Sequence, residues 1–138
     1  MIQESIKDRI QKRGLTQKKV CDDLGLIAQN FNGYLKGSRA IPFETLSSLM
    51  TYLRLGLFEP VSKTYTAMKN AQFIIKDKVD NEKLKLKDIA AKACVDQSTI
   101  SSFLNGHRDI SAKSLESILI ALEFQIKPFN PLFDKYDE

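Results

Sequence analysis

The sequence has few of the residues from which metal centres, disulfide frameworks and catalytic sites are built. It contains a single histidine, His107, and two cysteines, Cys21 and Cys94, with no second cysteine near either in a metal-type spacing. Both cysteines are expected to be reduced and buried in a cytosolic protein. A lone histidine lacks the partners that a metal site or a nucleophile–base pair requires. We therefore expect no metal and no cofactor.

Long apolar runs and phosphate-binding motifs are also absent. No run approaches the ~20 apolar residues that cross a membrane, and the charged start of the chain contains no apolar signal segment. There is no glycine-rich phosphate loop and no paired-carboxylate constellation. The sequence is therefore expected to be neither membrane-bound nor enzymatic, and to belong to the cytoplasm, at the nucleoid.

The charge balance is only mildly basic. The 21 basic and 17 acidic residues give a net charge of +4. Residues 1–60 hold 9 basic and 6 acidic residues, and the remainder holds 12 and 11. The first half is thus the more basic, which fits a polyanionic partner without establishing one.

An internal repeat organises the chain. Residues 15–39 (LTQKKVCDDLGLIAQNFNGYLKGSR) align without a gap with residues 84–108 (LKLKDIAAKACVDQSTISSFLNGHR), 69 positions later. The apolar matches include Leu15 with Leu84, Val20 with Ile89, and Leu35 with Leu104. Two copies of about 60 residues indicate tandem domains rather than a solenoid, which needs more and shorter units. Such small domains are individually marginal, so the two copies are expected to stabilise each other.

Apolar spacing predicts four short helices in each copy. In the first copy they run from the stripe of Ile2, Ile6 and Ile10 to Gly14, over residues 17–24, over about 28–35, and from Pro42 through Leu53. In the second copy they cover about residues 70–81, 86–93, 97–104 and 112–123. Thr16 and Asp96 are suited to cap the helices that follow them. The predicted organisation is a first domain at 1–57, a linker at 58–69, a second domain at 70–126 and a tail at 127–138. The tail is too apolar to be free, so it is expected to pack on the body or on a protein partner.

Three short motifs carry a family resemblance. Leu15-Thr16-Gln17 opens the second helix of the first copy, Gln97-Ser98-Thr99-Ile100-Ser101 forms the third helix of the second copy, and Gly37-Ser38-Arg39 matches Gly106-His107-Arg108. In these features the chain resembles the helix-turn-helix family of phage repressors, Cro proteins and xenobiotic-response-element-type bacterial regulators. The resemblance implies an all-α fold of two tandem lambda-repressor-like domains with four to five short helices each. It also implies a transcriptional regulator, repressor-like, that binds double-stranded DNA sequence-specifically.

The resemblance implies that the third helix of each copy enters the major groove. Residues expected to read bases are Gln29, Asn30, Asn32 and Gly33, the last by letting the backbone approach closely, and Gln97, Ser98, Ser101 and Ser102. Residues expected to contact phosphates are Gln17, Lys18, Lys36, Ser38, Arg39, Lys85, Lys87, Asn105, His107 and Arg108. For the polar helix faces the alternative is an ordinary solvated surface. For Lys18 and Lys85 the alternative is a role in solubility.

Each copy departs from the family pattern in a different place. Leu86 replaces Gln17, Ile27 occupies the cap position of Asp96, and Gly33 weakens a helix interior by about 1 kcal/mol. The alternative function is therefore a protein–protein interaction module, antitoxin-like or an assembly factor, that kept the fold and lost base reading. The sequence leaves open a homodimer or a pseudo-dimer within one chain, and inverted or direct half-sites.

Overall fold

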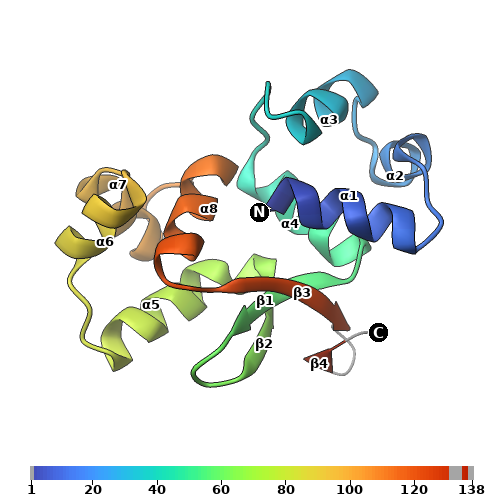
Figure 1. The fold of residues 1–138 in the computed structure, drawn as a ribbon. Helices are drawn as coiled ribbons and strands as arrows, with labels where there is room; N and C mark the ends of the chain where they lie inside the picture. The colour runs from blue at the N-terminus through green and yellow to red at the C-terminus, as the bar shows by residue number, and fades with distance from the viewer. Residues whose placement is uncertain (1, 131–134, 137–138) are drawn as a thin grey trace.

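Eight α-helices and four short strands make up the computed structural model, which describes residues 2–130 and 135–136 (Figure 1). The first unit contains α1 (Ile2–Lys12), α2 (Gln17–Leu24), α3 (Ala28–Leu35) and α4 (Phe43–Tyr52). The second contains α5 (Ala71–Asn81), α6 (Leu86–Ala93), α7 (Gln97–Leu104) and α8 (Ala112–Ala121). Each helix recurs at the repeat spacing with the same length, because the apolar stripes recur there. The predicted helices are confirmed to within two residues.

The expectation of an all-α fold is wrong, because the segments after α4 and α8 pair as strands. β1 (Leu55–Glu59), β2 (Thr64–Ala67), β3 (Gln125–Asn130) and β4 (Lys135–Tyr136) form an antiparallel sheet in the order β2-β1-β3-β4. Leu55 and Leu57 alternate with Gly56 on β1 and are buried. Their burial depends on pairing with β3, which lies far away in the sequence.

The segments expected as linker and tail therefore have regular structure. Residues 58–69 form the end of β1, the hairpin turn, β2 and most of the short 3-10 helix η1 (Met68–Asn70). Residues 127–130 complete β3, and residues 135–136 form β4. The rest of the predicted tail, residues 131–134 and 137–138, lies outside the described residues. In its described part, the tail packs on the body of the protein through the sheet.

The two units are related by an approximate two-fold axis. Leu57 and Ile126 occupy equivalent repeat positions and are direct partners in the β1–β3 ladder. Pro42 and Ser111 are also equivalent, and they form an isolated antiparallel bridge. Equivalent residues meet in an antiparallel pair only where a two-fold axis passes between them. The repeats are thus arranged by rotation rather than by translation, with β1 and β3 side by side at the centre (Figure 1).

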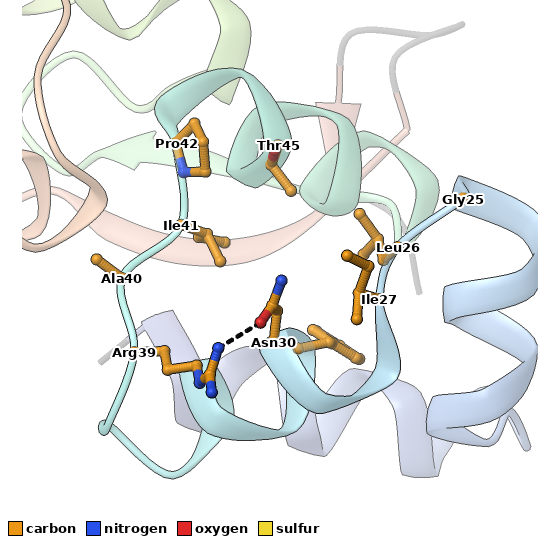
Figure 2. Close-up of a pocket in the computed structure, with 10 residues that line it drawn as sticks. Gly25, Leu26, Ile27, Asn30, Arg39, Ala40, Ile41, Pro42 and Thr45 are labelled. Atoms are coloured by element: carbon orange, nitrogen blue, oxygen red, sulfur yellow. Dashed lines mark hydrogen bonds between the residues drawn. The ribbon is translucent and has the colours of Figure 1, made fainter.

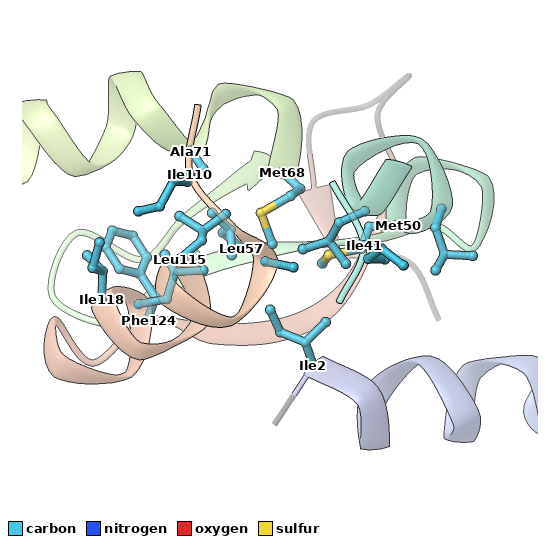
Figure 3. Packing of buried hydrophobic residues seen from close by; sticks show 14 of the residues in the cluster. Ile2, Ile41, Met50, Leu57, Met68, Ala71, Ile110, Leu115, Ile118 and Phe124 are labelled. Atoms are coloured by element: carbon cyan, nitrogen blue, oxygen red, sulfur yellow. The ribbon is translucent and has the colours of Figure 1, made fainter. Parts of the chain in front are cut away.

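One hydrophobic core runs through both units. The buried cluster includes Ile2 and Met50 from the first unit and Leu115 and Ile118 from the second, joined by Leu57 of β1 (Figure 3). All five side chains are 0% exposed. Burial of such a side chain contributes about 1.5–3 kcal/mol, so each marginal unit is stabilised by the other, as predicted.

Helix ends show where the local predictions succeed and fail. The Thr16 hydroxyl accepts a hydrogen bond from Lys19 N at 3.1 Å, which confirms the predicted cap of α2. Asp96 occupies the cap position of α7, but its exposed side chain accepts no capping hydrogen bond, so that prediction is wrong. Cys21 is buried as expected, whereas Cys94 is exposed. Cys94 ends α6 with φ 55°, in the left-handed region that Gly25 adopts at the end of α2.

Candidate nucleic-acid interface

The helices α3 and α7 each have one buried and one outward face. Phe31, Tyr34 and Leu35 on α3 are buried, as are Ile100, Phe103 and Leu104 on α7. This arrangement confirms the predicted core faces, since residues three and four apart share one side of a helix. Both helices lie in the upper half of Figure 1, whereas the strands lie in the lower half.

On α3, the predicted base-reading residues differ in their surroundings. Gln29 and Asn32 are exposed. Asn30 is half-buried, and its Oδ1 accepts a hydrogen bond from Arg39 Nη1 at 2.5 Å. Gly33 is buried because the Arg39 side chain covers it: a Cβ at Gly33 would lie 2.8 Å from Arg39 Cγ and Cδ. The open surface expected at Gly33 is therefore occupied by an arginine.

On α7, the corresponding face carries small polar side chains. Gln97 and Ser98 are exposed in the first turn, and Ser101 and Ser102 are half-buried. Asn105, at the end of the helix, donates a long 3.5 Å hydrogen bond to Ser101 Oγ. Nothing comparable to Arg39 covers this face among the contacts of the described residues. The two outward faces are thus similar in position and different in chemistry.

The predicted phosphate-binding residues lie beside these helices. In the first unit, Gln17 and Lys18 are exposed in the first turn of α2, and Lys36 is exposed at the end of α3. In the second, Lys85 and Lys87 are exposed at the start of α6. The remaining residues follow these two helices and are exposed: Ser38 and Arg39 after α3, and Asn105, His107 and Arg108 after α7. The loops that carry them meet at the Pro42–Ser111 bridge, beside the two-fold axis.

Two polar side chains near this surface are already engaged within the protein. Ser38 Oγ donates to Gly33 O at 3.1 Å, which holds the loop after α3 against the helix. Lys19 forms an ion pair with Asp23 at 3.1 Å, and the Tyr52 hydroxyl donates to the same carboxylate at 2.5 Å. The hydrogen bonds from Tyr52 and Lys19 lower the pKa of Asp23. The Tyr52–Asp23 hydrogen bond therefore holds α2 against the end of α4, and the ion pair of Lys19 lies within α2.

A surface cavity of about 520 Å³ opens between the α2–α3 turn and the loop that leads to α4 (Figure 2). Leu26, Ile27 and Ile41 belong to its apolar lining, and the Asn30–Arg39 hydrogen bond crosses its edge. Sequence reasoning missed this arrangement. The signal for it is the contrast between the repeats, since Gly33 and Asn30 stand where the second unit has Ser102 and Thr99.

Within residues 2–130 and 135–136, no three His, Cys, Asp or Glu side chains are grouped to hold a metal ion. In the same part of the chain, every helix is too short or too polar to cross a bilayer. The exposed polar faces of α3 and α7, with the basic side chains beside them, form the candidate site.

Comparison with known proteins gives one family match. Residues 75–128, from α5 into β3, match the helix-turn-helix family model. Neither curated proteins nor solved structures gave a match. The match supports the resemblance for the second unit, in which all the matched helices lie. Domains of this helix-turn-helix family are DNA-binding regulatory domains and are not typically enzymatic.

Proposed function

We propose that this chain, whose residues 75–128 match the helix-turn-helix family, is a DNA-binding transcriptional regulator of the xenobiotic-response-element type with two helix-turn-helix units. The matched residues lie in the second unit. The inclusion of the first unit is supported by the recurrence of all four helices with the same lengths and by the shared core. In each unit, α3 or α7 is the helix that enters the major groove.

The exposed side chains have suitable chemistry for base reading. Glutamine and asparagine pair bidentately with adenine N6 and N7, and serine contacts several bases. In the proposal, Gln29 and Asn32 read one half-site, and Gln97 and Ser98 read the other. Arg108 and the lysines at the start of α2 and α6 contact phosphates, which hold the register without reading sequence.

The approximate two-fold axis is the observation that carries the proposal furthest. Its evidence is the pairing of Leu57 with Ile126 and of Pro42 with Ser111. Helix-turn-helix dimers place two recognition helices on inverted half-sites about one helical turn apart. A pseudo-two-fold within one chain supports the same arrangement without a second copy. Covalent linkage raises the effective concentration of the second unit once the first is bound.

Selection of bound sequences from a random duplex pool at about 150 mM salt tests the function. The expected result is a two-part motif with inverted halves. A folded parent protein that enriches no sequence would overturn the proposal and favour the protein-binding alternative.

The variant Arg108→Ala adds a check on the phosphate contacts. It should weaken binding to all sequences alike and flatten the salt slope by about one unit, since each phosphate contact releases counterions. If the variant binds DNA with the parent's affinity at every salt concentration, Arg108 does not contact a phosphate.

A further inference from the structure

We infer that Arg39 is a specificity-determining residue that reads guanine from the surface of α3, rather than the phosphate contact expected from the sequence. This inference rests on the proposed function and specifies that one half-site contains a guanine that Arg39 reads.

The position of the arginine on the helix is the first part of the argument. Gln29 and Gly33 are four residues apart and therefore share one face of α3, opposite the buried face with Phe31. Gln29 is exposed on that face. The Arg39 side chain lies on Gly33, with Cγ and Cδ 2.8 Å and Cβ 3.3 Å from the place of a glycine Cβ. Arg39 thus supplies the side chain that Gly33 lacks on the outward face.

The loop after α3 holds the arginine in this place. The Gly33 carbonyl accepts hydrogen bonds from Ser38 N at 2.9 Å, from Ser38 Oγ at 3.1 Å and from Arg39 N at 3.3 Å. Gly37, with φ 81°, makes the turn that brings the chain back. At the far end of the side chain, Asn30 Oδ1 fixes one guanidinium nitrogen (Figure 2). Both ends of the side chain are therefore positioned before any DNA arrives.

The chemistry of the held group favours guanine. An arginine guanidinium carries five donors in a planar fork, and Asn30 accepts only one hydrogen bond from it in the structure. Asn30 is a neutral amide, so it does not neutralise the positive charge of the guanidinium group. A fork presented on the major-groove face is the usual partner of guanine O6 and N7. Pre-positioning reduces the loss of side-chain freedom on binding.

The second unit cannot form this arrangement. Ser102 stands at the Gly33 position and carries the Cβ that would clash with an arginine lying there, and Thr99 replaces Asn30. Arg108 therefore keeps its proposed phosphate role. The recognised sequence is accordingly an imperfect palindrome, with an arginine-read guanine in one half only.

The test compares Arg39→Lys with the matched variant Arg108→Lys. For each variant, the affinity is measured for the selected site and for every single-base change in that site. The salt dependence of the affinity is measured for the selected site alone. Arg39→Lys should lose about tenfold or more of the discrimination at one G·C pair in one half-site. Arg108→Lys should keep the parent's base preferences. Both variants retain the charge, so both should keep the parent's salt slope.

A second variant reaches the same interaction from the other partner. Gly33→Ser introduces the side chain of the second unit and displaces Arg39, so it should lose discrimination at the same base pair. A cooperative thermal unfolding transition is the control that this variant is folded. If the parent is selective but Arg39→Lys retains its base profile, or weakens all sequences evenly, the guanine contact is wrong while the proposed function stands. If the parent selects no sequence, the proposed function itself fails.

Discussion

The ion pair between Glu59 and Lys78 gives a sharp prediction about stability. Lys78 Nζ lies 2.5 Å from Glu59 Oε1, and the two side chains are 10% and 6% exposed. The other Glu59 oxygen accepts hydrogen bonds from Val61 N and from Ser62 N. Lys78→Met keeps the apolar stem and leaves a buried carboxylate without its cation. Removal of one partner from a buried pair costs about 3–5 kcal/mol. Because Val61 N and Ser62 N still donate to Glu59, we expect the loss in the free energy of unfolding to lie at the lower end of this range, at about 3 kcal/mol.

The loss should depend on pH in a defined direction. Burial raises the pKa of Glu59, but hydrogen bonds from Lys78, Ser62 and Val61 together lower it below the ordinary value of 4.5. In the parent, this contribution to stability is complete above the unfolded pKa and is lost as the pH falls through the folded pKa. In Lys78→Met the hydrogen bond and the charge of Lys78 are lost, so the pKa of Glu59 should lie higher than in the parent and the variant should lose less stability as the pH falls. The difference between the two proteins should therefore narrow from pH 7 to about pH 4.

Urea unfolding, followed by far-UV circular dichroism at both pH values, measures this difference. Lys76→Met is the matched control, because Lys76 is exposed on the same helix. The control should change the free energy of unfolding by less than about 0.5 kcal/mol. A loss for Lys78→Met below about 1 kcal/mol at pH 7, or an equal loss at both pH values, would refute the reasoning.

Further predictions concern the core and the helix ends. Leu57→Ala should lower the free energy of unfolding by about 2–5 kcal/mol, and calorimetry should still show one cooperative transition. The control Val61→Ala, at a residue 78% exposed, should change it little. Separate transitions for the two units would contradict a shared core. Cys94→Gly should raise the melting temperature and Gly25→Ala should lower it, because a left-handed backbone costs a residue with a side chain about 1–2 kcal/mol. A shift of the melting temperature in the same direction for both variants would be inconsistent with the positive φ values at the two positions. Thr16→Ala should lose about 1 kcal/mol in chemical denaturation and Asp96→Ala clearly less, since only Thr16 accepts a capping hydrogen bond.

The helices were predictable because their signals are local. The stripe of Ile2, Ile6 and Ile10 and the cap at Thr16 each lie within one or two turns of the helix that they define. The repeat then fixed the second set of helices from the first. The agreement of the bounds follows from these short-range interactions, which tertiary contacts did not override.

The sheet was not predictable from the same signals. β1 is stabilised by β3, and the partners Leu57 and Ile126 are separated by the whole second unit. Thr64–Ala67 alternates polar and apolar residues over only four positions, which is too short a run to predict a strand, so the weak periodicity of the surrounding segment indicated a linker. The two-fold relation also became evident only when equivalent residues were found paired with each other.

The candidate site was partly predictable. Helical periodicity identified the outward faces of α3 and α7, and Gln29, Asn32, Gln97 and Ser98 are exposed on them. The contact between Arg39 and Gly33 depends on the path of the loop after α3, which the sequence alone does not define. The difference between Gly33 and Ser102 at equivalent repeat positions indicates that the two helix surfaces differ there. It does not indicate that the Arg39 side chain covers Gly33.

The central claim is that one chain spans an inverted site across its two-fold axis. Binding affinity for duplexes that carry the selected half-sites in inverted, direct or single form tests this claim most directly. The inverted duplex should bind one chain and bind it about 100-fold or more tighter than a single half-site, because both units engage. The direct arrangement should bind no better than a single half-site. Equal affinity for the inverted and direct duplexes, or two chains on the inverted duplex, would contradict the account.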